Sequence, residues 1–248
     1  MSSLEGKYLY AIVADAGDQE FGKIGMEGGR VYSITEGPVS AIVSDFGQPR
    51  IRPERRNIAS HQAVLKALMA DRTPLPIKFG VVSGSIKDIK KILSRNKNAF
   101  LEQLRRVEGK VEMGLRVSWD VPNIFEYFIA VYPELRSARD RLFGTHREPS
   151  QEDKIEVGRM FDRLLQEARE EHASKVEDVL TPCCFEVKRN TTRDERDVMK
   201  LACLVGRKES QTSFEAAVLE AAKLFDNNFA FDFNGPWAPH NFVELELA

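Results

Sequence analysis

The pattern of apolar and polar residues divides the first part of the chain into short strands followed by helices. Residues 8–13 are apolar at every position, which is typical of a strand in the middle of a sheet. A β-hairpin is predicted next, with arms at residues 31–34 and 39–43 and a Gly-Pro break between them. Apolar residues at helical spacing then mark three helices. These helices are expected near residues 58–68, 86–93 and 99–107.

The rest of the chain alternates strands and helices more regularly. Residues 111–119 have the two-residue period of a half-buried strand, and Pro133 interrupts the helical stretch that follows. The remaining expected elements are a long helix at 153–180, strands at 183–188 and 199–207, a helix at 213–225, a Phe-rich strand at 229–233 and an edge strand at 242–247. Gly235 and Pro236 are expected to end the Phe-rich strand, which would let Trp237 cap the core.

The order of these elements predicts an α+β protein of two domains. The first is an N-terminal α+β domain at residues 1–109. The second, at residues 110–248, has the βαββαβ order of a ferredoxin-like domain, with an inserted helical segment at about 121–150 after its first strand. Charge follows the same division, because the first part carries a net positive charge and the second a net negative one.

Charge also bears on the class of partner. The formal net charge of -2 is too small to indicate nucleic acid or a membrane as the main partner. Ferredoxin-like domains can bind RNA through aromatic strands, but residues 200–208 contain no aromatic residue. A nucleic-acid or small-ligand binding module on this scaffold remains the alternative interpretation.

The chain has no signal-peptide layout at its N-terminus and no uncharged apolar stretch long enough to span a bilayer. Its three cysteines include an adjacent pair, Cys183 and Cys184, which is a poor basis for disulfides. These features predict a protein of the reducing cytosol.

Motifs that carry chemistry are missing from the sequence. It has no P-loop, no dinucleotide-binding glycine triplet and no nucleophile elbow, and its four histidines are scattered. His61 lies on the apolar face of its helix, so we interpret it as a core histidine. Cys183 and Cys203 are interpreted as small hydrophobic residues. No catalytic, cofactor or metal site is therefore expected, although an enzyme site built from dispersed residues stays open.

Four segments together resemble the gas vesicle protein F/L family (GvpF/GvpL). They are residues 8–13, the Pro-Leu-Pro-Ile-Lys-Phe-Gly segment at 74–80, residues 201–205, and residues 233–243 with Gly-Pro-Trp-Ala-Pro near the C-terminus. His240, Lys200 and Cys203 depart from residues common in the family at those positions. The order and spacing of the four segments cover nearly the whole chain.

The resemblance implies a non-enzymatic accessory protein of gas vesicle assembly, located at the gas vesicle within the cytoplasm. Its implied partners are the small hydrophobic shell protein (GvpA-type) and other gas vesicle accessory proteins, with no nucleic acid and no lipid membrane. It would bind the shell protein during nucleation or growth and limit its aggregation.

The residues expected to contact a partner lie in the two proline-containing motifs and the last strand. They are Lys78, Phe79, Trp237, Val243, Leu245 and Leu247. Prolines on either side of Leu75 fix an extended backbone that leads to a turn at Gly80, and an acidic face would keep the last strand soluble. A purely structural role for both motifs, as corners of the fold, is the favoured interpretation.

Overall fold

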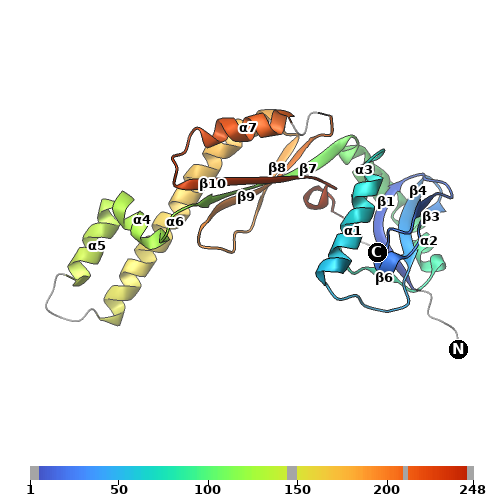
Figure 1. Cartoon of the computed structure of the whole chain (residues 1–248), viewed down its shortest axis with the longest axis horizontal. Helices are drawn as coiled ribbons and strands as arrows, with labels where there is room; N and C mark the ends of the chain where they lie inside the picture. The colour runs from blue at the N-terminus through green and yellow to red at the C-terminus, as the bar shows by residue number, and fades with distance from the viewer. Residues whose placement is uncertain (1–5, 144–149, 209–211, 245–248) are drawn as a thin grey trace. The chain divides into compact units, whose positions relative to one another are not determined.

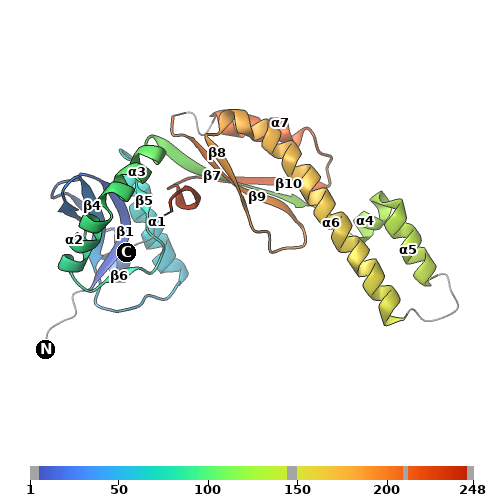
Figure 2. The same cartoon turned by 180° about the vertical axis from the view of Figure 1, so that it is seen from behind.

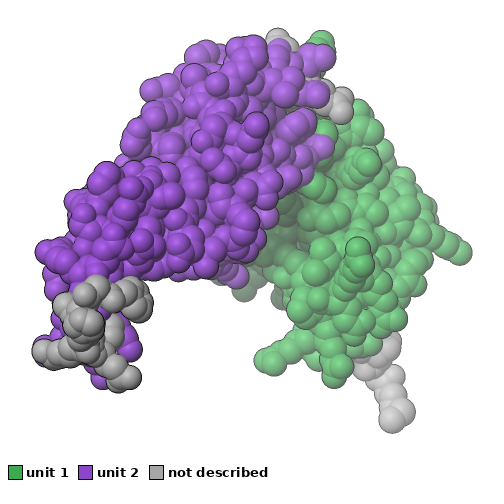
Figure 3. Space-filling view, turned by 60° about the vertical axis from the view of Figure 1, so that its left-hand side comes forward, with its two compact units in different colours: residues 1–112, 204–208, 236–248 green, residues 113–203, 209–235 purple. Residues whose placement is uncertain are grey.

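The computed structural model describes residues 6–143, 150–208 and 212–244. These residues form two compact units (Figure 3). Within the described ranges, the first unit contains residues 6–112, 204–208 and 236–244, and the second contains residues 113–203 and 212–235. Helices and strands occur in both units, so the expected α+β class is confirmed.

A mixed-length antiparallel sheet forms the centre of the first unit (Figure 1). Its strands are β1 (Lys7–Ala14), β2 (Glu20–Gly22), β3 (Val31–Glu36), β4 (Val39–Asp45), β5 (Leu75–Pro76) and β6 (Val82–Ser83). The strand order is β2-β3-β4-β1-β5, and β6 also pairs with β1. The central position of β1 confirms the interpretation of its continuous apolar run, and the β3–β4 hairpin is confirmed as well.

Helices cover both faces of this sheet, which explains why β1 is buried on each side. Helix α1 (Arg55–Leu68) packs on Tyr8 and Tyr10 through Val64, Leu65 and Leu68. Helices α2 (Ile86–Arg95) and α3 (Lys97–Val107) cover the opposite face. Their buried contacts on that face are with Leu9, Ile12, Ile34, Ala41 and Val43. The Ser85 hydroxyl caps α2 by accepting a hydrogen bond from the Asp88 N–H.

The second unit is built around a four-stranded sheet with the order β10-β7-β9-β8. The strands are β7 (Lys110–Trp119), β8 (Glu186–Asn190), β9 (Asp197–Gly206) and β10 (Phe229–Trp237). Helices α6 (Gln151–Leu180) and α7 (Thr212–Ala222) lie on the same face of this sheet (Figures 1 and 2). The two βαβ segments of this sheet are interleaved. Strand β9 lies between β7 and β8, and β7 lies between β9 and β10, as the βαββαβ order requires.

The expected insertion consists of α4 (Ile124–Val131) and α5 (Pro133–Phe143), which pack beside α6. Pro133 is the first residue of α5, where the missing N–H of proline costs no helical hydrogen bond. Helix α6 begins with a capping box between Ser150 and Asp153, and a 3₁₀ turn at Thr181–Cys183 follows its end.

Two local expectations near the C-terminus are wrong. Residues 242–244 are not a strand, because Phe242 ends a 3₁₀ turn (His240–Phe242) and is fully buried. The carboxylate of Glu112 accepts hydrogen bonds from the backbone N–H and the Nδ2 amide of Asn241, at 2.8 and 2.6 Å, and these bonds fix the turn. Leu245 and Leu247, in the same expected strand, lie outside the described residues.

Gly235 and Pro236 do not end the Phe-rich strand, since β10 continues to Trp237. An edge strand tolerates proline because one of its sides has no ladder of hydrogen bonds. Gly235 has a φ of 129°, a conformation that favours glycine. Trp237 is 40% exposed and therefore does not cap the core as expected.

Candidate partner-binding sites

The Pro74–Gly80 segment is a short strand followed by a turn on the first sheet. Leu75 and Pro76 pair with β1, and the N–H of Ile77 donates to the carbonyl of Tyr10 at 2.9 Å. The turn at Gly80 has a φ of 94°. Of the two predicted contact residues here, Lys78 is exposed, whereas Phe79 is half-buried and packs on the rings of Tyr8 and His61.

A buried aromatic cluster lies beneath this turn. The Tyr8 hydroxyl lies 2.9 Å from Nδ1 of His61, and it accepts a hydrogen bond from the Gly80 N–H at 3.1 Å. Burial, followed by the nearby His240, lowers the pKa of His61 to about 4, and burial raises the pKa of Tyr8 to about 12. A general base for neutral pH needs a pKa near 7, so this histidine is placed for packing.

The second proline-containing motif meets the first in this cluster. Ala238 belongs to the same buried core as Tyr8 and Tyr10, and His240 is close enough for its charge to act on the pKa of His61. Burial also lowers the pKa of His240. The two proline-containing motifs, which are two of the four segments that carry the resemblance, are thus brought together around one core histidine. Sequence reasoning placed His61 in the core but gave no sign of this meeting.

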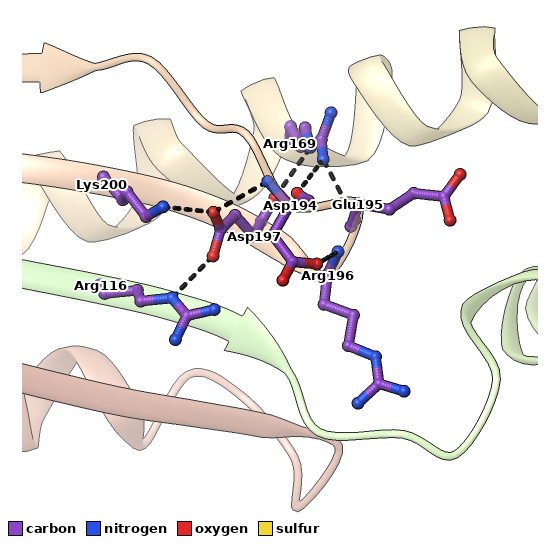
Figure 4. Close-up of polar contacts among 7 residues, drawn as sticks. All are labelled: Arg116, Arg169, Asp194, Glu195, Arg196, Asp197 and Lys200. Carbon is purple, nitrogen blue, oxygen red and sulfur yellow. Dashed lines mark hydrogen bonds and ion pairs between the residues drawn. The ribbon is translucent and has the colours of Figure 1, made fainter.

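A network around Asp197 joins β9, β7 and α6 in the second unit (Figure 4). The Asp197 carboxylate is fully buried and accepts hydrogen bonds from Arg116 Nε at 2.7 Å and Lys200 Nζ at 2.5 Å. Burial acts to raise the pKa of Asp197, but the bonds from Lys200 and Arg116 outweigh it and hold the pKa below its usual range.

Arg169 of α6 completes the Asp197 network through backbone acceptors. Its guanidinium donates to the carbonyl oxygens of Asp197, Asp194 and Glu195 at 2.9, 3.2 and 3.1 Å. The network therefore fixes the turn that leads into β9. The sequence showed only a charged loop at this position, because the partners on β7 and α6 are about 30 to 80 residues away.

The three cysteines gather where α6 ends and the strands β8 and β9 begin to pair. Cys183 Sγ lies 3.8 Å from Cys184 Sγ, and Cys203 is fully buried. Burial raises the pKa of Cys183 to about 12, and a contact with Cys203 raises that of Cys184. Such thiols are poor nucleophiles. Among the described residues, no group of three or more His, Cys, Asp or Glu side chains is arranged to hold a metal ion.

Two apolar surfaces of the second sheet and its helices are open to solvent. The first is the edge strand β10, where Phe233 is 41% exposed. The second is a hollow of about 400 Å³ formed by α4, α6, the turn after α7 and the neighbouring strand ends. Six aromatic side chains line the hollow: Trp119, Tyr127, Phe128, Tyr132, Phe225 and Phe229. Sequence reasoning did not find the hollow, since its walls come from four separate segments.

The remaining predicted contact residues are spread over the first unit. Trp237 ends β10, and Val243 is half-buried against the core that α2 and α3 form with the sheet. Leu245 and Leu247 cannot be placed, as they lie outside the described ranges. The described members of the predicted set do not form one continuous site in the first unit's core, because Phe79 and Val243 pack on opposite faces of the sheet.

Fold and surfaces together define an α+β protein with a ferredoxin-like sheet, a buried aromatic cluster around His61 and exposed apolar surfaces. No helix in the described part of the chain is both long and apolar enough to cross a membrane. The profile of the family described as "Gas vesicle synthesis protein GvpL/GvpF" matches residues 6–244. The chain belongs to this family, and a gas vesicle role follows from its membership.

Curated relatives are similar to the chain over almost their whole lengths. Gas vesicle protein F from Nostoc sp. (strain PCC 7120) is 25% identical, with 97% of this chain and 98% of that protein covered. Gas vesicle protein F from Streptomyces sp. (strain CB03234) is 27% identical, with coverages of 96% and 99%. Gas vesicle protein L from the same Streptomyces strain is 22% identical, with coverages of 99% and 95%.

Two solved structures share the fold. The crystal structure of gas vesicle protein GvpF from Anabaena sp. PCC7120 aligns with a TM-score of 0.83 at 24% identity, covering 98% of this chain and 99% of that one. The crystal structure of GvpF from Microcystis aeruginosa aligns with a TM-score of 0.81 at 21% identity, with coverages of 97% and 100%. At these identities the likeness establishes the fold, including the mixture of helices and two sheets.

Proposed function

We propose that this chain is a minor, vesicle-associated component that binds the hydrophobic shell protein during nucleation or growth of the gas vesicle. Binding shields an aggregation-prone subunit until it joins the wall, and no covalent bond is made or broken. The protein acts in the cytoplasm at the growing vesicle, together with other gas vesicle accessory proteins. Family membership supplies the gas vesicle context, and the surface of β10 supports the binding step.

The observation that carries this proposal is the exposed aromatic surface of an edge strand. Strand β10 is nine residues long and lies at the end of the sheet order, with β7 as its neighbour. Phe233 is 41% exposed and Trp237 is 40% exposed. An edge strand with apolar side chains can pair with an extended segment of another protein. An apolar shell subunit is a suitable partner for such a surface.

The C-terminal residues Val243, Leu245 and Leu247 remain a second candidate surface for the same partner. Val243 is half-buried against the core of the first unit and follows the turn that Glu112 fixes. Lys78 is exposed beside the Gly80 turn and Phe79 is half-buried there, which makes them candidates for the rim of a contact rather than its centre.

Capture of the shell protein tests the proposal. Phe233→Lys and Trp237→Lys place a charge on the β10 surface, and we expect each to reduce capture of co-expressed shell protein in a pull-down by about tenfold. Phe185→Lys is the matched control, because Phe185 is 64% exposed and precedes β8 at the other edge of the sheet. Circular dichroism and thermal unfolding check that each variant is folded.

The C-terminal surface is tested separately with Leu245→Lys. Reduced capture by this variant, with unchanged capture by the β10 variants, moves the contact to the C-terminus and keeps the proposed function. If wild-type protein captures no shell protein, or if it does not reduce shell-protein aggregation measured by light scattering, the proposed function is wrong.

A further inference from the structure

The aromatic hollow of the second unit has the size of a small ligand pocket. Its volume of about 400 Å³ is at the lower end of the range of roughly 300–1,000 Å³ typical of ligand pockets. Trp119 and Phe128 are almost completely buried and form its floor, with ring centroids 5.4 Å apart. Tyr132 stacks on Phe128 at 5.2 Å, and Phe225 packs on Phe229 at 4.9 Å.

The chemistry of this lining favours a cation. Aromatic faces carry negative electrostatic potential and attract ammonium and guanidinium groups. Glu171 and Asp226 add two carboxylates to the lining. Burial, and then Glu171 and Glu167, raise the pKa of Tyr132; burial, and then Asp226, raise the pKa of Tyr127. The carboxylates are therefore close enough to act on both tyrosine hydroxyls.

Both carboxylates of the hollow already have partners within the chain. The Asp226 carboxylate accepts hydrogen bonds from the backbone N–H and Nδ2 of Asn228, at 2.9 and 3.0 Å, in a solvent-exposed contact. Lys175 pairs with Glu171 at 2.6 Å, but both side chains are about half exposed or more, and such pairs are weak and exchangeable. His172 packs on Phe225 and Phe229, and burial, followed by Lys175, lowers its pKa. His172 is thus neutral at neutral pH and does not repel a cation. Arg163 is engaged by Glu167 and Glu134.

We propose that this hollow binds an arginine or lysine side chain of a partner protein, presented next to an apolar residue. The cation enters among the aromatic rings toward Glu171 and Asp226. The adjacent apolar residue packs on Val131 and Leu224, which line the same hollow and are 49% and 56% exposed. The site lies at Phe229, the first residue of β10, and does not use Phe233 or Trp237. Binding of a cation at the hollow can therefore be tested independently of shell-protein binding by β10.

Trp119 provides a direct reporter of binding. The chain has two tryptophans, so Trp237→Phe leaves Trp119 as the only one. In this background, full-length protein is titrated with the peptide acetyl-Leu-Arg-Leu-Leu-amide, and Trp119 emission is recorded. We expect a saturable change with the Arg peptide and at least tenfold weaker binding of the same peptide with Glu in place of Arg. Equal binding of the two peptides, or no saturable change, overturns the proposal.

Charge variants show whether the carboxylates take part. Glu171→Gln and Asp226→Asn, each in the Trp237→Phe background, are expected to weaken the Arg peptide by about threefold to tenfold. Glu156→Gln is the matched control, an exposed residue on α6 away from the hollow with the same change of charge. If the control weakens binding as much as Glu171→Gln, net charge explains the effect and the proposed site is wrong. Asp226→Asn also tests the role of the carboxylates at a residue that does not pair with Lys175.

Discussion

The hydroxyl of Tyr8 lies 2.9 Å from Nδ1 of His61, and both residues are almost completely buried. Because the hydroxyl accepts a hydrogen bond from the Gly80 N–H, its own proton is available to His61. One hydrogen-bonded pair thus links β1, α1 and the turn after β5, and burial of the ring favours the uncharged form of His61.

The burial of His61 predicts acid sensitivity of the folded state. The pKa of His61 falls from its ordinary 6.5 to about 4 through burial and the nearby His240, and burial lowers the pKa of His240 too. Between these pH values the unfolded chain binds more protons than the folded one. The stability that neutral His61 contributes is therefore fully present above pH 6.5 and is lost as the pH falls toward 4. For His61 alone we expect a loss of about 3 kcal/mol, measured by urea unfolding across this window.

His61→Phe separates this effect from general acid denaturation. Phenylalanine keeps an aromatic ring next to Tyr10 and Phe79 but cannot be protonated. The variant is expected to be less stable at pH 7, because the Tyr8 hydroxyl loses its hydrogen-bond partner on His61, and to lose less stability between pH 6.5 and 4. An unchanged slope in that window would show that other groups control the acid response.

Tyr8→Phe should destabilise the first unit although the ring is kept. The change leaves Nδ1 of His61 and the N–H of Gly80 without their partner, and a buried polar group without a hydrogen bond costs about 1–3 kcal/mol. We expect a loss of about 2 kcal/mol in chemical unfolding. Tyr32→Phe is the control, since its hydroxyl bonds the exposed Asp45, and its expected cost is about 0.5 kcal/mol or less. Equal costs for the two variants would contradict the role of the buried pair.

Much of the fold could be predicted because local sequence and tertiary structure agree over long segments. The continuous apolar run of β1, the period-two pattern of β7 and the helical stripe of α6 each face the layers that their patterns require. Pro133 ends one helix and begins another in accordance with its local geometry. The helix face of His61 alone predicts a core residue, and His61 is buried.

Other features depend on long-range contacts that local patterns do not encode. The sequence at 243–247 alternates apolar and acidic residues as an edge strand does, which suggests a strand from Phe242 onward. The bonds of Asn241 with Glu112 and the burial of Phe242 instead hold a 3₁₀ turn at His240–Phe242. Pro236 continues a strand because β10 lies at a sheet edge, which only the strand order reveals. The aromatic hollow likewise needs the turn after α7 to lie beside α4. Composition and periodicity do not contain that information.

The last prediction concerns Asp197, the buried carboxylate that joins β9 to β7. Asp197→Asn keeps the volume of the side chain but removes the charge that Arg116 and Lys200 face. Loss of one member of a buried pair costs about 3–5 kcal/mol. Arg116 and Lys200 are 41% and 33% exposed and can be partly hydrated, so we expect about 2 kcal/mol in chemical unfolding. Asp178→Asn, an exposed change on α6, should cost about 0.5 kcal/mol or less.

A double-mutant cycle assigns this cost to the contact between Asp197 and Arg116. Arg116→Gln alone should destabilise the protein by about 1 kcal/mol, since Lys200 still neutralises the carboxylate. Combined with Asp197→Asn, the total should be smaller than the sum of the two single costs by about 1 kcal/mol, because the second change removes a charge that has already lost its partner. Strictly additive costs would mean that the Asp197 carboxylate stabilises the fold through Lys200 and the Asp194 N–H. The contact with Arg116 would then contribute nothing measurable to stability.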